Sequence, residues 1–203
     1  MQKQVRSKKD LEIYLQKLQK PEFYKNQLEQ YPTSAAVAAE ILFLALLDGN
    51  ILDKTVADLG AGNGIFSVGA ALLGANKVYA VELDENMVKV LRKNSEDLDV
   101  EIIQGDVITF RENVDTVFMN PPFGSVIEGS DRKFLDSAMK FGKHIYSIHN
   151  LKSADFIRSY YSREFTIMRE QRMGIMVPRL YAHHTMDQKS IPGIFFHCEL
   201  QNK

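Results

Sequence analysis

Short apolar runs alternate with amphipathic stretches along most of this chain, and this alternation predicts the order of its elements. Runs of strand length occupy residues 55–59, 77–82, 100–104, 114–119, 144–148, 165–177 and 193–200. Helical patterns occupy residues 8–30 (interrupted at Lys20-Pro21), 35–47, 65–73, 85–95, 131–141 and 153–162. Strands that alternate with helices predict an α/β fold, in which helices cover both faces of a mostly parallel sheet.

The pattern changes near the end of the chain. Residues 178–192 separate the last two predicted strands and show no helical periodicity. Strands joined without a crossover helix pair antiparallel, as in a hairpin. We therefore expect a seven-stranded sheet with one antiparallel edge strand, in a single domain of residues 1–203. Residues 1–50 would form N-terminal helices and residues 51–203 the α/β core.

Composition excludes several classes of protein. The chain has 203 residues, of which 45% are hydrophobic and 25% are charged, so a disordered, collagenous or coiled-coil chain is excluded. The single cysteine, Cys198, allows neither an internal disulfide framework nor a cysteine-built zinc site. The N-terminus does not resemble a signal peptide, and the longest apolar stretch, residues 35–47, is too short to span a membrane. We expect a cytoplasmic protein without its own metal site.

Charge is distributed unevenly along the chain, although the net charge is only −1. Residues 1–30 carry a net +3 and residues 116–203 a net +4, whereas residues 82–115 carry −6. Basic ends could hold a polyanion such as RNA despite the nearly neutral total. The alternative is a solvated surface on which these charges cluster by chance.

A glycine-rich turn, residues 58–64, lies between a predicted strand and a predicted helix. Its glycines, Gly60, Gly62 and Gly64, allow a sharp turn and a close approach of the backbone to a ligand. A dinucleotide-binding turn would need glycine where Ile65 stands, and a phosphate loop would need a Lys-Ser/Thr pair, which is absent. The ligand is therefore expected to be neither a dinucleotide nor a nucleoside triphosphate.

Two acids follow the next two strands. Glu82 stands 22 residues beyond Gly60, where a carboxylate can accept hydrogen bonds from both ribose hydroxyls of a nucleoside. Asp106 follows the third strand and could accept a hydrogen bond from an adenine amino group. Asp84 is a less certain third acid, which we expect to cap the helix that follows. The sequence thus predicts a nucleoside site at three successive strand ends.

The tetrad Asn120-Pro121-Pro122-Phe123 ends the fourth strand, where ligands bind in doubly wound sheets. An exocyclic amine of a base is a poor nucleophile because its lone pair is delocalised into the ring. The Asn120 side-chain oxygen and the Pro121 carbonyl oxygen could each accept a proton of that amine and direct its lone pair at a methyl donor. Pro121 and Pro122 would hold these acceptors in place, and Phe123 could stack on an unpaired or extruded base.

This ordered set resembles the class I S-adenosylmethionine-dependent methyltransferases. Their first motif has the pattern acid-x-G-x-G-x-G, which Asp58, Gly60, Gly62 and Gly64 satisfy. The resemblance implies a Rossmann-like class I methyltransferase fold with S-adenosylmethionine as cofactor, a molecule that carries no phosphate. It also implies that Asp58 faces the amino-acid end of the cofactor, where its charge suits the ammonium group.

The Asn120 tetrad resembles the signature of amino-methyltransferases, which act on adenine N6, on guanine N2 of rRNA or on a glutamine amide in proteins. The glutamine enzymes more often have tyrosine in the fourth position, so Phe123 favours a nucleobase. Four segments carry a closer resemblance: residues 29–33, 58–64, 120–124 and 146–149. They are similar to a small archaeal and eukaryotic methyltransferase-like family whose eukaryotic members modify adenine N6 in 18S ribosomal RNA.

That family resemblance covers about residues 28–150 and implies several further features. Gln30, Tyr31 and Thr33 would help to close the cofactor pocket. Family members also use a small zinc-binding activator protein, paired along a sheet edge. We therefore expect an RNA adenine-N6 methyltransferase that acts on ribosomal RNA. The alternatives are a guanine-N2 rRNA methyltransferase, a protein glutamine-N5 methyltransferase, and a non-catalytic RNA-binding or assembly module that retains a cofactor site.

Overall fold

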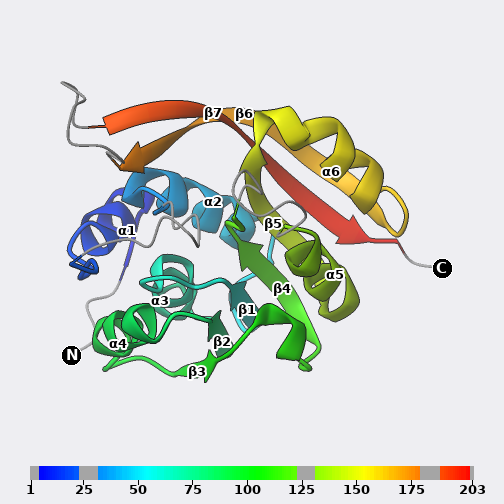
Figure 1. Cartoon of the computed structure of the whole chain (residues 1–203). Helices are drawn as coiled ribbons and strands as arrows, with labels where there is room; N and C mark the ends of the chain where they lie inside the picture. Colours follow the sequence, from blue (N-terminus) through cyan, green and yellow to red (C-terminus); the bar gives the residue numbers. More distant parts are fainter. Residues whose placement is uncertain (1–4, 23–31, 123–130, 179–187, 202–203) are drawn as a thin grey trace.

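The computed structural model describes residues 5–22, 32–122, 131–178 and 188–201 (Figure 1). Its strands are β1 Thr55–Leu59, β2 Lys77–Glu82, β3 Val100–Gln104, β4 Val114–Met119, β5 Gly142–Asn150, β6 Phe165–Pro178 and β7 Gln188–Leu200. Its helices are α1 Lys8–Leu15, α2 Ala35–Leu47, α3 Ile65–Leu72, α4 Glu85–Asn94, α5 Arg132–Phe141 and α6 Ala154–Tyr161, with 3₁₀ turns η2 Val107–Thr109 and η3 Leu151–Ser153. No helix in the described part of the chain is long and apolar enough to cross a membrane.

The strands form one seven-stranded sheet in the order β3-β2-β1-β4-β5-β7-β6. Strands β1 to β5 pair in parallel, and β7 runs antiparallel to both β5 and β6. The predicted mostly parallel sheet and its terminal hairpin are therefore confirmed. The antiparallel strand β7 lies one position inside the sheet, and β6 closes the edge.

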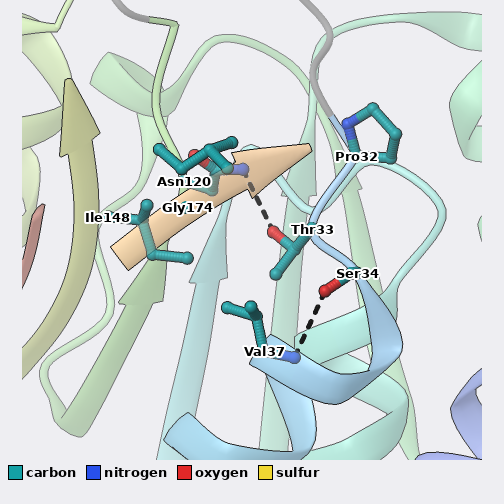
Figure 2. Close-up of a pocket in the computed structure, with 8 residues that line it drawn as sticks. Pro32, Thr33, Ser34, Val37, Asn120, Ile148 and Gly174 are labelled. Atoms are coloured by element: carbon teal, nitrogen blue, oxygen red, sulfur yellow. Dashed lines mark hydrogen bonds between the residues drawn. The ribbon is translucent and has the colours of Figure 1, made fainter. Parts of the chain in front are cut away.

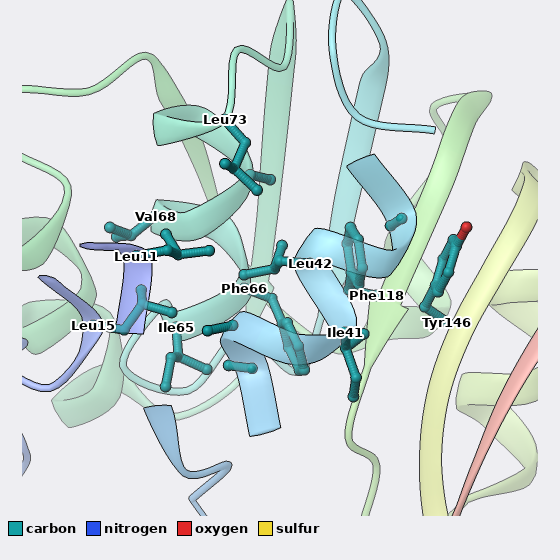
Figure 3. Packing of buried hydrophobic residues seen from close by; sticks show 14 of the residues in the cluster. Leu11, Leu15, Ile41, Leu42, Ile65, Phe66, Val68, Leu73, Phe118 and Tyr146 are labelled. Carbon is teal, nitrogen blue, oxygen red and sulfur yellow. The ribbon is translucent and has the colours of Figure 1, made fainter. Parts of the chain in front are cut away.

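Two apolar layers cover the sheet. On one face α1, α2 and α3 pack against strand residues that include Phe118 and Tyr146 (Figure 3). On the other face α5 and α6 pack against a second cluster that includes Val117 and Phe196. Neighbouring residues 117 and 118 of β4 thus face opposite layers, because successive side chains of a strand point to opposite faces. This burial on both faces explains why the strands are continuous apolar runs.

The last hairpin is longer than the sequence pattern predicts. Strand β7 begins at Gln188 rather than at residue 193, because its pairing with β6 continues from Gly193 to Gln188 beyond the point where β5 ends. Pro192 interrupts the apolar pattern in this part of β7, so the pattern alone could not reveal the extension. The hairpin therefore extends past the carboxyl end of β5.

Polar contacts fix helix α2 against the sheet at the helix's carboxyl end. The Tyr146 hydroxyl donates a hydrogen bond to Asp48 Oδ2 (3.0 Å) and accepts one from Asn50 Nδ2 (2.8 Å). At the other end, Ser34 caps the helix and accepts from the backbone N–H of Val37 at 3.3 Å. The start of α2 is thereby held near the carboxyl ends of the central strands.

Candidate active site at the carboxyl ends of the strands

The glycine turn after β1 adopts backbone conformations that other residues rarely take. Gly60, Gly62 and Gly64 have φ values of 75°, 57° and 87°, all in the left-handed region. A Cβ atom on Gly64 would also lie only 2.3 Å from Leu91 Cδ1 of α4. The turn therefore requires the alternating glycines, and Gly64 also allows α4 to pack closely against it.

Glu82, at the end of β2, holds this turn in place. Its Oε2 atom accepts a hydrogen bond from the Gly62 N–H (2.7 Å), and Oε1 accepts one from the Asp84 N–H (2.8 Å). Burial raises the pKa of the Glu82 carboxyl, and the hydrogen bonds from the two backbone N–H groups oppose this shift. A carboxylate has about four lone-pair positions, so Glu82 can accept further hydrogen bonds from a ligand.

Asp84 has the capping role that the sequence favoured. It is the N-cap residue of α4, and its Oδ1 atom accepts a hydrogen bond from the Asn86 N–H at 3.0 Å. The side chain is also buried, with 5% of its surface exposed. This residue therefore helps to fix the beginning of α4 beside the glycine turn.

Asp106 lies at the end of the neighbouring strand β3 and forms an ion pair that the sequence did not indicate. Its Oδ2 atom is 2.6 Å from Lys133 Nζ on α5, and Oδ1 accepts a hydrogen bond from the Ile108 N–H at 3.2 Å. Burial acts to raise the pKa of Asp106, but the hydrogen bonds from Lys133 and Ile108 outweigh it and lower that pKa. Asp106 is therefore held as an anion at the carboxyl edge of the sheet.

Two exposed aliphatic side chains accompany these acids, and sequence reasoning missed them. Leu83 follows Glu82 and is 49% exposed, while Ile108 follows Asp106 by two residues and is 56% exposed. A flat apolar ligand between two such side chains would remove their surface from water. Their position one or two residues after each acid was the available signal.

Asp58 lies deeper than the other acids. Only 1% of its surface is exposed, and Oδ2 accepts hydrogen bonds from the Ser67 N–H (2.9 Å) and Oγ (2.6 Å). Burial raises the pKa of Asp58 to about 7, although the hydrogen bonds from Ser67 act against the shift. Asp58 therefore joins β1 to α3, and its expected contact with an ammonium group stays a prediction.

Asn120 ends β4 beside the start of α2, as Figure 2 shows. Its Nδ2 atom donates a hydrogen bond to Thr33 Oγ1 at 3.0 Å. The two residues line a pocket with residues 34 and 37, Ile148 of β5, and residues 174–175 of the extended hairpin. Because the amide nitrogen is turned toward Thr33, the amide oxygen points away from it.

Most of the predicted site residues gather at the carboxyl ends of β1 to β4. Thr33 contacts the asparagine of the tetrad, and its expected role in closing the cofactor pocket stays a prediction. Pro121 is buried and Pro122 is half-buried directly after Asn120. Gln30, Tyr31 and Phe123 lie outside the described residues, so the roles expected for them stay predictions.

Comparison with known proteins gives relatives over nearly the full chain. The family model for ribosomal protein L11 methyltransferase (PrmA) matches residues 41–168. The rRNA N(6)-adenosine-methyltransferase METTL5 of Danio rerio is 36% identical over 160 residues, which cover 74% of this chain and 77% of that protein. The Drosophila melanogaster rRNA N(6)-adenosine-methyltransferase Mettl5 is 31% identical over 204 residues, which cover 94% of this chain and 95% of that protein.

A solved structure agrees with these relatives. A protein from Pyrococcus horikoshii, provisionally described as an RNA methyltransferase, superposes with a TM-score of 0.90 and 36% identity. The superposition covers 98% of this chain and 100% of that one. It therefore includes the terminal hairpin, most of which lies beyond the residues that the L11 methyltransferase model matches.

The raised pKa of Asp58 leads to a prediction about stability and pH. The pKa is about 7 in the folded protein against 3.8 for a free carboxyl, so this group stabilises the fold below pH 4. That contribution is lost as the pH rises through 7. Relative to Asp58→Asn, the wild-type unfolding free energy should fall between pH 4 and 7 by at most about 1.4 kcal/mol per pH unit. Urea denaturation of both proteins at a series of pH values measures this change in unfolding free energy.

Asp115→Asn is the control for this experiment. The hydrogen bond from Lys143 lowers the pKa of Asp115, so this group is ionised in both folded and unfolded chains above pH 5. The difference in unfolding free energy between Asp115→Asn and wild type should not change between pH 5 and 7. A similarly constant difference for Asp58→Asn would contradict the proposed burial of an ionisable carboxyl.

Proposed function

This chain belongs to the family of class I S-adenosylmethionine-dependent methyltransferases that includes the rRNA N(6)-adenosine-methyltransferases, and we propose that it methylates N6 of an unpaired adenine in ribosomal RNA. Two relatives with that activity match it over at least 74% of this chain and at least 77% of their own. The L11 methyltransferase model stops at residue 168, before most of the terminal hairpin that lines the Asn120 pocket. The substrate is therefore proposed from the longer matches.

The residues at the ends of β1, β2 and β3 fit the nucleoside part of S-adenosylmethionine. Glu82 would accept hydrogen bonds from the ribose hydroxyls through the lone pairs that its backbone contacts leave. Asp106 would accept from the adenine amino group while Lys133 keeps it ionised. Leu83 and Ile108, both exposed, would cover the faces of the adenine ring. The cofactor supplies an electrophilic methyl group.

The observation that carries the proposed chemistry is the orientation of the Asn120 amide. Its nitrogen donates to Thr33, so the oxygen is directed away and can accept a hydrogen bond from the target amine. The Pro121 carbonyl oxygen would accept a second hydrogen bond from the same amine, which makes the nitrogen lone pair available for attack. The surplus proton of the methylated nitrogen would be lost to water after methyl transfer. These acceptors act as the methyl group moves, so they stabilise the transition state more than the bound substrate.

The activity can be tested by incubating the protein with radiolabelled S-adenosylmethionine and ribosomal RNA from cells that lack the gene. Methyl label should appear on adenine N6, identified by mass spectrometry of digested nucleosides. Label on guanine, or on a ribosomal protein with the RNA unlabelled, would replace the proposal with one of its alternatives. Absence of any transfer would support a non-catalytic module.

Variants at Asn120 and Thr33 test the mechanism within the same assay. Asn120→Ala should lower turnover by about two to three orders of magnitude, as loss of a transition-state hydrogen bond does in other enzymes. Thr33→Val removes the acceptor for the Asn120 amide, whereas Thr33→Ser keeps it. Turnover should fall in Thr33→Val and recover in Thr33→Ser, with cofactor affinity unchanged. Equal activity of the two Thr33 variants would contradict the positioning role.

Glu82 generates a separate prediction about cofactor binding. Glu82→Gln leaves an amide in place of the anion that would receive both ribose hydroxyls, and a hydrogen bond to a charged group contributes about 1.5–3 kcal/mol. S-adenosylmethionine affinity should fall about tenfold or more in calorimetry. Glu101→Gln, an exposed acid on β3 paired with Lys77, is the matched control and should bind normally. Normal affinity in Glu82→Gln would refute the ribose assignment.

A small zinc-binding activator is proposed as a partner from the family resemblance, and edge strand β3 is the better of the two candidate edges. Ile102 and Ile103 on β3 are partly exposed. Edge strand β6 instead carries the charged residues Arg169, Glu170 and Arg172, and charges oppose strand addition. The described residues include no cluster of metal-binding side chains, so the zinc would belong to the partner.

Hydrogen exchange of the purified complex tests this assignment. A small protein containing zinc should co-purify with the chain from its native cells, and amide exchange in β3 should slow in the complex while that in β6 stays the same. Protection of β6 alone would move the interface to the other edge. Full activity of the isolated chain, with no zinc protein bound in the cell, would remove the partner from the proposal.

A further inference from the structure

A group of aromatic and arginine side chains lies where α5 and α6 meet, and all of its members except Tyr160 are exposed. The Phe156 and Tyr160 rings are in contact on α6, with centroids 5.4 Å apart. The Arg132 guanidinium of α5 lies 5.9 Å from the Phe156 ring, and the Arg163 guanidinium lies 4.4 Å from the Tyr160 ring. We propose that this α5–α6 face, made of these four residues, binds the single-stranded RNA that adjoins the target nucleotide.

The two arginines of the α5–α6 face are available for phosphate groups. Both are exposed, and neither forms an ion pair with another described residue. The neighbouring cation Arg158 differs, because it is paired with both Asp155 and Glu170. Exposed, unpaired cations that contact phosphates release the counterions condensed on the nucleic acid. This release is a main source of affinity for nucleic acid.

The aromatic side chains of the face have a suitable arrangement for bases. Phe156 is 39% exposed and lies beside the Arg132 guanidinium. The Tyr160 hydroxyl donates a hydrogen bond to Asp136, which fixes the ring. The Tyr160 ring is only 9% exposed and supports the Phe156 ring. An exposed ring with adjacent arginines is the combination that binds unpaired bases in single-strand-binding proteins.

The α5–α6 face begins at the carboxyl ends of the strands, where Asn120 lies. Arg132 is the first residue of α5, which follows β4, and Phe156 is in the first turn of α6, which follows β5. The carboxyl ends of β4 and β5 lie together because the two strands are parallel. From Phe156 to Tyr160 the helix advances four residues, about 6 Å along its axis, and Arg163 follows the last residue of α6 by two positions. Figure 1 shows α5 and α6 on the same side of the sheet.

RNA suits this face better than a protein partner does. Phe156 is the one large apolar side chain of the described part of α5 and α6 that is markedly exposed, so little apolar area is available for a protein interface. The exposed ring of the face instead suits a base, and its guanidinium groups suit phosphates. This inference rests on the proposed RNA substrate and adds the surface by which that substrate is held.

Two variants of the full chain test the inference. Phe156→Ala removes a stacking surface, and Arg132→Gln with Arg163→Gln removes two phosphate contacts. Each should weaken binding of a fluorescent single-stranded RNA about tenfold at physiological salt. The double variant should also reduce the slope of log affinity against log salt by about 1.4, since each single-strand phosphate contact contributes about 0.7. Cofactor affinity should remain that of wild type.

The matched control is Arg92→Gln with Lys93→Gln, which removes two exposed charges from α4 on the other side of the sheet. The control should bind RNA almost as wild type does. If wild type methylates RNA but the face variants bind like the control, this inference is wrong and the proposed function stands. If wild type methylates a protein and leaves RNA unlabelled, both are wrong. Loss of a protein partner with unchanged RNA affinity would also overturn the inference.

Discussion

The buried carboxylate of Glu82 is the constraint on which the site's geometry depends. It joins the end of β2 to Gly62 of the glycine turn and to the N–H of Asp84, the residue that caps α4. Three segments are thereby fixed by one side chain before any ligand enters. A burial cost that raises the pKa of this acid is offset by the backbone donors. The proposed hydrogen bonds to a ribose would then need no rearrangement of the turn.

Helix α2 connects the packing of the N-terminal layer to the reacting end of the site. Its apolar side chains bury against the sheet, and Tyr146 fixes its carboxyl end through Asp48 and Asn50. Its beginning then places Thr33 against Asn120, a residue 87 positions later in the chain. The orientation of one side-chain amide is thus set by the docking of a whole helix. A purely local motif at the end of β4 would leave this amide without its orienting contact.

Local patterns predicted the fold and part of the site well. The limits of β1, β2, β3 and β4 agree with the sequence pattern, because these strands are buried on both faces and end at glycines, acids or prolines. The contact of Thr33 with Asn120 and that of Lys133 with Asp106 could not be predicted in this way. Each joins residues far apart in the chain, so it depends on how whole elements dock. The extension of β7 was missed for the same reason, since β6 rather than its own sequence determines where it begins.

The inward position of β7 also affects how the chain can be made. Tyr146 of β5 pairs with His197 of β7, so the centre of the sheet is complete only after some fifty further residues have left the ribosome. Until then β5 is an unpaired edge with apolar side chains on both of its surfaces, a hazard for aggregation of nascent chains. The preceding strands can already form their parallel sheet during synthesis. A chaperone that covers β5 at this stage would protect the nascent protein where it is most vulnerable.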